Sequence, residues 1–145
     1  MIQWHYIIEE DDAMNFEEYI RKVYTIAFRL TGDETSAKDV ASLAIDKNAN
    51  IVKENIDSNI LHITIKEVCG IFLKEYSIFS SESFYNKNNT TIQNKLMNLE
   101  PLSRTAVVWK DIMGYNMKDL ETISNCPKSE LYEKLNKARK NLIHF

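Results

Sequence analysis

The chain is poor in residues that interrupt helices, with only three glycines and two prolines among its 145 residues. Its two cysteines, Cys69 and Cys126, lie far apart and lack the CxxC spacing of metal or redox sites. We therefore expect both to be small buried thiols of a reducing compartment. The three histidines, His5, His62 and His144, follow no metal-ligand spacing and are expected at the surface or its boundary.

Long apolar runs are also absent, since no stretch approaches the roughly 18 apolar residues of a membrane span. The first residues, MIQWHYIIEEDD, lack the basic start and apolar run of a secretory signal. We expect a cytoplasmic protein with no membrane partner. No paired carboxylates, nucleophile with a base, metal-ligand cluster or Gly-rich phosphate loop can be identified. The sequence therefore predicts no enzyme activity, catalytic residue, small-molecule substrate, metal or cofactor.

Charge is distributed unevenly along the chain, whose formal net charge is −3. From Asn94 onward 9 basic residues face 6 acidic ones, a balance of +3, and the preceding residues carry −6. The overall charge argues against a general nucleic-acid binder, but the last third has the sign that phosphate requires.

Apolar spacing predicts three helices before residue 77, the first ending near Gly32 and the third running to Tyr76. Their expected starts are Asn15 as an N-cap with Glu18 three residues later, then Thr35 or Ser36, then Asp57 or Ser58. The β-branched stretch ILHITI of the third is open to interpretation as a strand, but its 3.6-residue spacing favours a helix.

The polar segment SIFSSESFYNKNNTT, residues 77–91, predicts a linker between domains at 1–76 and 92–145. Four short helices are expected after it, opening at Thr90 or Thr91, Ser103, Asn116 and Ser129. Their inward residues are expected to be Ala106, Val107 and Trp109 or Ile112 in the second, and Leu131, Leu135, Ala138 and Leu142 in the last.

The succession of an amphipathic helix, Gly114, a short helix, a Pro127 turn and a terminal helix is the outline of a helix-turn-helix. Three amphipathic helices also form small bundles that never touch DNA, so the pattern leaves both interpretations open. The fold class expected is all-α, with two small helical domains joined by a polar linker and a helix-turn-helix in the second.

The residues resemble those of bacterial RNA polymerase sigma factors of the small, two-domain extracytoplasmic-function type. Leu99 and Pro101 match the family's Leu-Pro stretch, and PKSELYEKLNKARKNL, residues 127–142, matches the segment that carries its recognition helix. VYTIAFRLTGDETSAKDVASLAI, residues 23–45, is similar to its paired first helices. The resemblance covers about 120 residues and is most specific at the end.

The resemblance implies two binding surfaces. One binds RNA polymerase core through the second helix, at Lys38, Asp39, Ser42, Leu43 and Asp46. The other binds promoter DNA through the terminal helix, at Lys128, Ser129, Tyr132, Glu133, Lys134, Lys137, Arg139 and Lys140. Lysine and arginine suit phosphates, and a glutamate can accept a hydrogen bond from cytosine.

Two functions follow as hypotheses. The first is a sigma-like initiation factor that binds polymerase core and promoter DNA. The second is a degenerate sigma-like regulatory module that binds a protein partner, an anti-sigma factor or the polymerase, without reading DNA. The second is favoured by the missing basic residues and by Glu130 and Glu133, which lie in the recognition-helix segment, since carboxylates repel phosphate.

Overall fold

The computed structural model describes residues 14–50, 56–76 and 91–143, and all regular structure in these ranges is helical. The all-α prediction is confirmed. Backbone pairing of the β type is limited, in the same ranges, to one bridge between Met14 and Ile56. The elements are α2 (Phe16–Thr31), α3 (Glu34–Lys47), α4 (Ser58–Ile71), α5 (Ile92–Met97), α6 (Pro101–Val107), α7 (Met117–Ser124) and α8 (Lys128–Ile143), with π-helical segments η1 (Phe72–Tyr76) and η3 (Val108–Ile112).

The first three helices begin where short polar side chains can cap them. The Asn15 side chain accepts a hydrogen bond from the Glu18 amide at 2.8 Å, as predicted, and Gly32 ends α2 with φ of +69°. Helix α3 starts at Glu34, slightly earlier than predicted, because the Asp33 carboxylate caps the Ser36 amide at 2.8 Å.

The β-branched stretch at the start of α4 is helical, as predicted. Asp57 caps the Ile60 amide at 2.9 Å, and Ile60, Leu61, Ile65 and Val68 share the buried face of the helix. Burial of a helical stripe against α2 and α3 outweighs the β propensity of the stretch.

Two of the predicted helix starts after residue 90 need correction. Helix α6 begins at Pro101 and not at Ser103, because proline fits the first helical turn, where its missing N–H is not needed. Helix α8 begins at Lys128, directly after Pro127, and not at Ser129. The other predicted N-caps, Thr91 for α5 and Asn116 for α7, are confirmed.

The predicted inward residues of the later helices are largely confirmed. Leu131, Leu135 and Ala138 are buried, and Leu142 packs against the core from a half-buried position. Ala106, Val107 and Trp109 are also buried. Ile112 was the alternative to Trp109, and its side chain is exposed.

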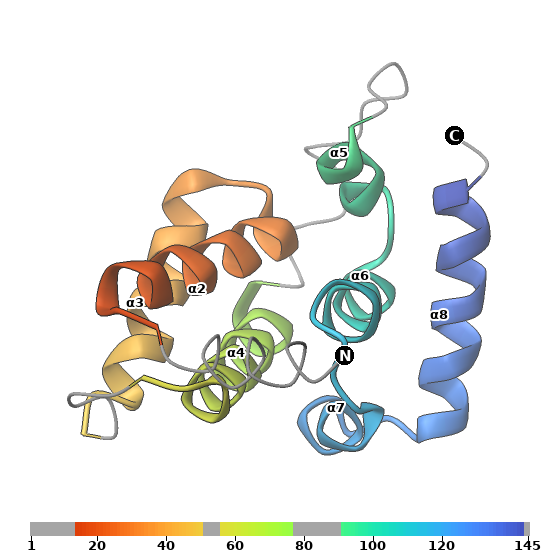
Figure 1. Ribbon diagram of the computed structural model, residues 1–145. Helices are drawn as coiled ribbons and strands as arrows, with labels where there is room; N and C mark the ends of the chain where they lie inside the picture. The colour runs from red at the N-terminus through yellow and green to blue at the C-terminus, as the bar shows by residue number, and fades with distance from the viewer. Residues whose placement is uncertain (1–13, 51–55, 77–90, 144–145) are drawn as a thin grey trace, which may run out of the picture.

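One cluster of buried side chains runs through the described residues, from Tyr19 in α2 to Ala138 in α8. In Figure 1, α2 and α3 lie at the left, α4 at the lower centre, and α6, α7 and α8 at the right. Helix α2 contacts α5 and α6, and α4 contacts α7, so the segments before and after residue 90 pack against each other. The linker prediction, residues 77–91, lies outside the described residues except for Thr91, and the division into two domains stays a prediction.

Arg104 is fully buried, and its guanidinium contacts carbonyl oxygens in place of a carboxylate. It donates to Leu30 at 2.6 Å, Leu96 at 2.9 Å and Leu99 at 2.9 Å, and its carbon lies 5.7 Å from the centre of the Phe72 ring. Burial lowers the pKa of Arg104 to about 10. One side chain of α6 thereby joins the ends of α2 and α5.

Replacing Arg104 with methionine is expected to lower the free energy of unfolding by about 2–4 kcal/mol, because buried carbonyls lose their donor. The stability of Arg104→Lys should lie between those of the unchanged protein and Arg104→Met, since an ammonium cannot donate to three separated carbonyls as a guanidinium does. Urea unfolding provides the measurement. The exposed Arg21→Met is the control, and a loss for Arg104→Met no greater than for this control would contradict the assignment.

Gly32 and Gly114 form a matched pair, since both have positive φ, +69° and +73°, but only Gly32 is crowded. A Cβ at Gly32 would lie 2.6 Å from the Met97 sulfur, whereas at Gly114 it would meet nothing within 4 Å. Gly114→Ala is expected to lower the free energy of unfolding by about 1 kcal/mol because of backbone strain. Gly32→Ala is expected to lower it by about 1 kcal/mol more, because the added Cβ also clashes with Met97. Thermal unfolding of both variants tests this, and equal losses would show that Met97 moves aside freely.

Candidate functional site

Helix α7 is capped at both ends, and a tight turn joins it to α8. The Asn116 side chain accepts from the Lys118 amide at 2.8 Å, and the Trp109 indole donates to the Asn116 carbonyl at 2.7 Å. Asn125 ends α7 in the left-handed conformation, with φ of 55°, and Pro127 precedes α8. The Glu121 carboxylate then accepts from the Lys128 amide at 3.2 Å. The Asn125 cap and the Glu121 contact lie at this turn, where they set the direction in which α8 leaves α7.

Helix α8 presents one face to the core and the opposite face to solvent. Its exposed residues include most of those predicted to contact DNA: Lys128, Ser129, Tyr132, Glu133, Lys137 and Lys140. Asn136 is exposed as well and was missed, although it lies four residues after Tyr132 and four before Lys140. That spacing places Asn136 on their face and was available in the sequence.

The other two predicted DNA contacts, Lys134 and Arg139, have intramolecular partners. The Lys134 ammonium lies 2.7 Å from a Glu100 oxygen, and Arg139 binds Asp111 through two nitrogens at 2.5 and 2.9 Å. The hydrogen bonds to these carboxylates raise the pKa of both cations. Both pairs hold α8 against α6 and η3. No local pattern indicates them, since each joins residues about 30 positions apart.

The residues predicted to bind polymerase share an exposed face of α3. Lys38, Asp39, Ser42, Leu43 and Asp46 all lie at the surface, and Leu43 exposes 45% of its area. The opposite face of the helix, with Ala37, Val40, Ala41 and Ala44, packs into the core. The α3 face is therefore a polar surface with one large apolar side chain.

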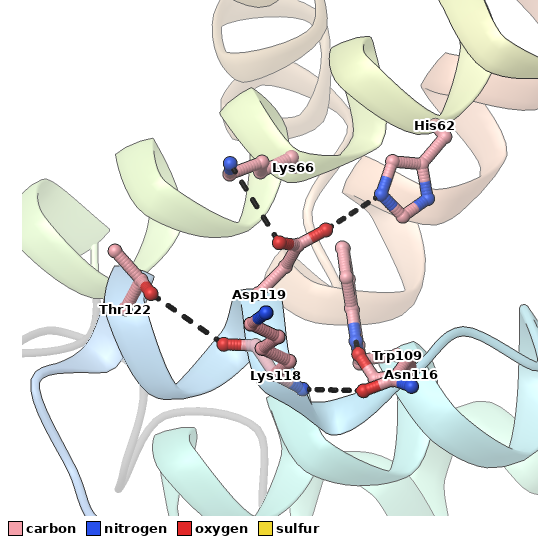
Figure 2. A network of polar contacts seen from close by, with 7 residues as sticks. All are labelled: His62, Lys66, Trp109, Asn116, Lys118, Asp119 and Thr122. Carbon is pink, nitrogen blue, oxygen red and sulfur yellow. Dashed lines mark hydrogen bonds and ion pairs between the residues drawn. The ribbon is translucent and has the colours of Figure 1, made fainter.

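A polar network links α4 to α7 (Figure 2). The Asp119 carboxylate of α7 points toward α4, where one oxygen lies 2.8 Å from His62 Nε2 and the other 3.9 Å from Lys66 Nζ. The hydrogen bond from His62 is the main cause that lowers the pKa of Asp119. His62 also contacts the rings of Trp109 and Tyr115, with centroids 5.4 and 4.3 Å away.

His62 is partly exposed, in agreement with its predicted boundary position. Its pairing with Asp119, 57 residues later, was missed because no local pattern joins them. Across the described ranges, no group of three His, Cys, Asp or Glu side chains is arranged to hold a metal ion. Cys69 and Cys126 are free and buried, as predicted, and burial raises the pKa of the Cys69 thiol to about 12.

Comparison with known proteins finds no matching family model, no matching curated protein and no matching solved structure. Within residues 14–50, 56–76 and 91–143, no helix is long and apolar enough to cross a bilayer. The exposed faces of α3 and α8 are the surfaces of the described residues that a partner can reach without disturbing the core.

Replacing Asp119 with asparagine should reduce stability most at neutral pH. Because the folded-state pKa of Asp119 is lowered, its stabilisation is present above the unfolded-state value and is lost as pH falls through the folded-state value. Urea unfolding at pH 7 and pH 3 is expected to show a large loss for the variant at pH 7 and a small one at pH 3. Asp39→Asn, on the exposed face of α3, is the control. Equal losses for Asp119→Asn at the two pH values would contradict the role of the pair.

Proposed function

We propose that the protein is a divergent sigma-factor-like transcription initiation protein that binds RNA polymerase core and promoter DNA. In this proposal α7 and α8 are the two helices of a helix-turn-helix, and α8 enters the major groove. The observation that carries it is the α7–α8 pair itself, with a capped turn, a buried stripe on α8 and a solvent-facing opposite face. The sequence resemblance to sigma factors supplies the class of partner.

The charges and polar groups of the exposed α8 face divide into two roles. Lys128, Lys137 and Lys140 carry no ion pair within the described residues, so their ammonium groups are available to DNA phosphates. Tyr132 and Asn136 lie on the same face, where an asparagine amide can read adenine. Lys134 and Arg139 would have to exchange a carboxylate for a phosphate, so we assign them to positioning α8.

The α3 face is proposed as the surface for polymerase core. Leu43 provides an exposed apolar anchor, and Lys38, Asp39, Ser42 and Asp46 surround it with polar groups. An apolar centre with a polar rim is the usual composition of a protein interface. Because core packing uses the opposite face of α3, a partner can bind here without disturbing the fold.

A second function, a sigma-like regulatory module that binds a protein partner without reading DNA, is favoured by one observation. Two of the five cations on α8, Lys134 and Arg139, are paired with Glu100 and Asp111. Glu130 and Glu133 are exposed on the same helix, which leaves the free face with little net positive charge. Weak charge lowers affinity for DNA, whose binding depends largely on phosphate contacts.

Replacing Lys128, Lys137 and Lys140 with glutamine tests the DNA interface. We expect weaker binding to duplex DNA and a fall in the dependence of log K on log salt of about 0.9 for each lost phosphate contact. Fluorescence anisotropy at several salt concentrations provides the measurement. The control replaces Lys22, Lys47 and Lys74, which lie outside α8, with glutamine. Equal salt slopes for the two triple variants would remove α8 as the DNA-binding helix.

Titration into bacterial RNA polymerase core separates the two proposed functions. Submicromolar binding together with transcription from a promoter library supports the initiation factor, and Leu43→Asp should then weaken core binding by about tenfold or more. Thr35→Asp, also at the exposed surface of α3, is the matched control. Core binding without DNA binding supports the regulatory module, and the absence of both overturns the assignment to polymerase.

A further inference from the structure

An open hollow of about 680 Å³ lies between α4 and η1 on one side and α6 and α7 on the other. Its volume is within the range of small-molecule sites. Apolar side chains from both sides line it, Ile71 and Leu73 from the first and Leu102 and Ile123 from the second. None of the residues assigned to the proposed DNA or polymerase surfaces lines it.

Gly70, on the wall of the hollow, is not explained by the packing of the fold. It lies inside α4, where alanine is the better helix former. Its φ is not in the left-handed region, and an added Cβ would come no closer than 3.6 Å to Ile123, which is an ordinary contact. The glycine therefore opens a notch in the hollow at a cost to helix stability.

Two lysines stand on either side of this notch. Lys66, Gly70 and Lys74 are spaced by four residues along α4 and η1, so they lie on nearly the same stripe, and all three line the hollow. Lys74 has no ion-pair partner among the residues that the structure describes, and Lys66 makes only the 3.9 Å contact with Asp119. Both ammonium groups are on flexible stems that can converge on an anion above Gly70.

The remaining charges of the hollow limit how negative a ligand can be. Glu67 is paired with Lys47 at 3.6 Å, and Glu75 lies on the rim without an ion pair in the described part of the chain. These carboxylates repel polyanions such as nucleic acid, and the two lysines beside Gly70 attract a single negative charge.

The backbone beside the notch is also unusual, since η1 is a π-helical turn inserted at the end of α4. Such turns are rare and frequently occur at functional sites. Here the turn carries Leu73, Lys74 and Glu75, all of which line the hollow.

We propose that this hollow binds a small monoanionic amphiphile, such as a carboxylate on an aliphatic body. The carboxylate lies over Gly70 between Lys66 and Lys74, and the apolar body lies against Leu102 and Ile123. Because these walls belong to α4, α6 and α7, a bound ligand bridges the segments before and after residue 90. The proposal does not depend on the proposed function, since it involves neither DNA nor polymerase.

The test uses decanoate as the probe, below its micelle concentration, and decanol as a neutral probe with the same tail. Titration of the full chain is followed by amide and methyl NMR. We expect saturable shifts at Gly70 and Ile123 with decanoate, and affinity at least about fivefold weaker with decanol. Shifts that cluster at the smaller hollow lined by Ile26, Leu61 and Met113, or no saturable shifts, would overturn the proposal.

Two variants separate binding from folding. Gly70→Ala is expected to keep or raise the melting temperature, because the helix gains a better former, yet to weaken decanoate binding by about threefold or more as the notch is filled. Lys74→Gln should weaken decanoate and leave decanol unchanged. Lys22→Gln, on the rim of the smaller hollow, is the matched control and should change neither. Unchanged decanoate affinity in Gly70→Ala would refute the assigned position of the ligand.

Discussion

The fold depends on a buried cation that is held by helix ends. The last carbonyls of a helix have no partner within that helix, and they carry the negative end of its dipole. Arg104 places its guanidinium where α2 and α5 both end, and it donates to Leu30, Leu96 and Leu99. The dipoles and lone pairs of these carbonyls compensate the buried charge, so no carboxylate is required. Arginine suits this place because its planar fork can serve several acceptors at once.

The end of α2 receives a second set of donors from the same part of the chain. The Gln93 amide donates to the carbonyls of Phe28 at 3.0 Å and Arg29 at 3.3 Å, and Arg29 donates to the Gln93 oxygen. Met97 fills the space that Gly32 leaves open. Helix α2 is therefore completed by residues that follow residue 90. With the His62–Asp119 pair between α4 and α7, these contacts explain why one hydrophobic core spans both parts of the chain.

Ion pairs that hold the helices together also reduce the positive charge that is free to bind a partner. Lys134 and Arg139 hold α8 against α6 and η3 through Glu100 and Asp111, so their charge is already compensated. Ion pairs beside the buried stripe of a helix hold that helix in place. The cations that form them are then not available to bind DNA phosphates. The proposed DNA surface thus depends on three lysines and on polar side chains such as Asn136. In the described part of the chain, no salt bridge engages Lys38, Asp39 or Asp46 on the proposed core-binding face of α3.

The local structure of the helices follows from the sequence alone. Asn15, Asp57, Thr91 and Asn116 mark helix starts because a short polar side chain caps amides within its own turn, and the apolar spacing after them identifies the buried faces. The starts that were misplaced, at α3, α6 and α8, differ by one or two residues, where Asp33 or a proline supplied an alternative first turn.

The partners of the polar side chains, in contrast, depend on how the helices pack together. No local pattern in the sequence distinguishes Arg104 from an exposed cation. Its burial depends on carbonyls up to 74 positions away. The partners of His62, Lys134 and Arg139 are likewise distant, and the notch at Gly70 exists only because α6 and α7 face it. Helix caps and stripes are set by neighbours within a few residues, whereas ion pairs, buried charges and hollows are set by which helices pack together.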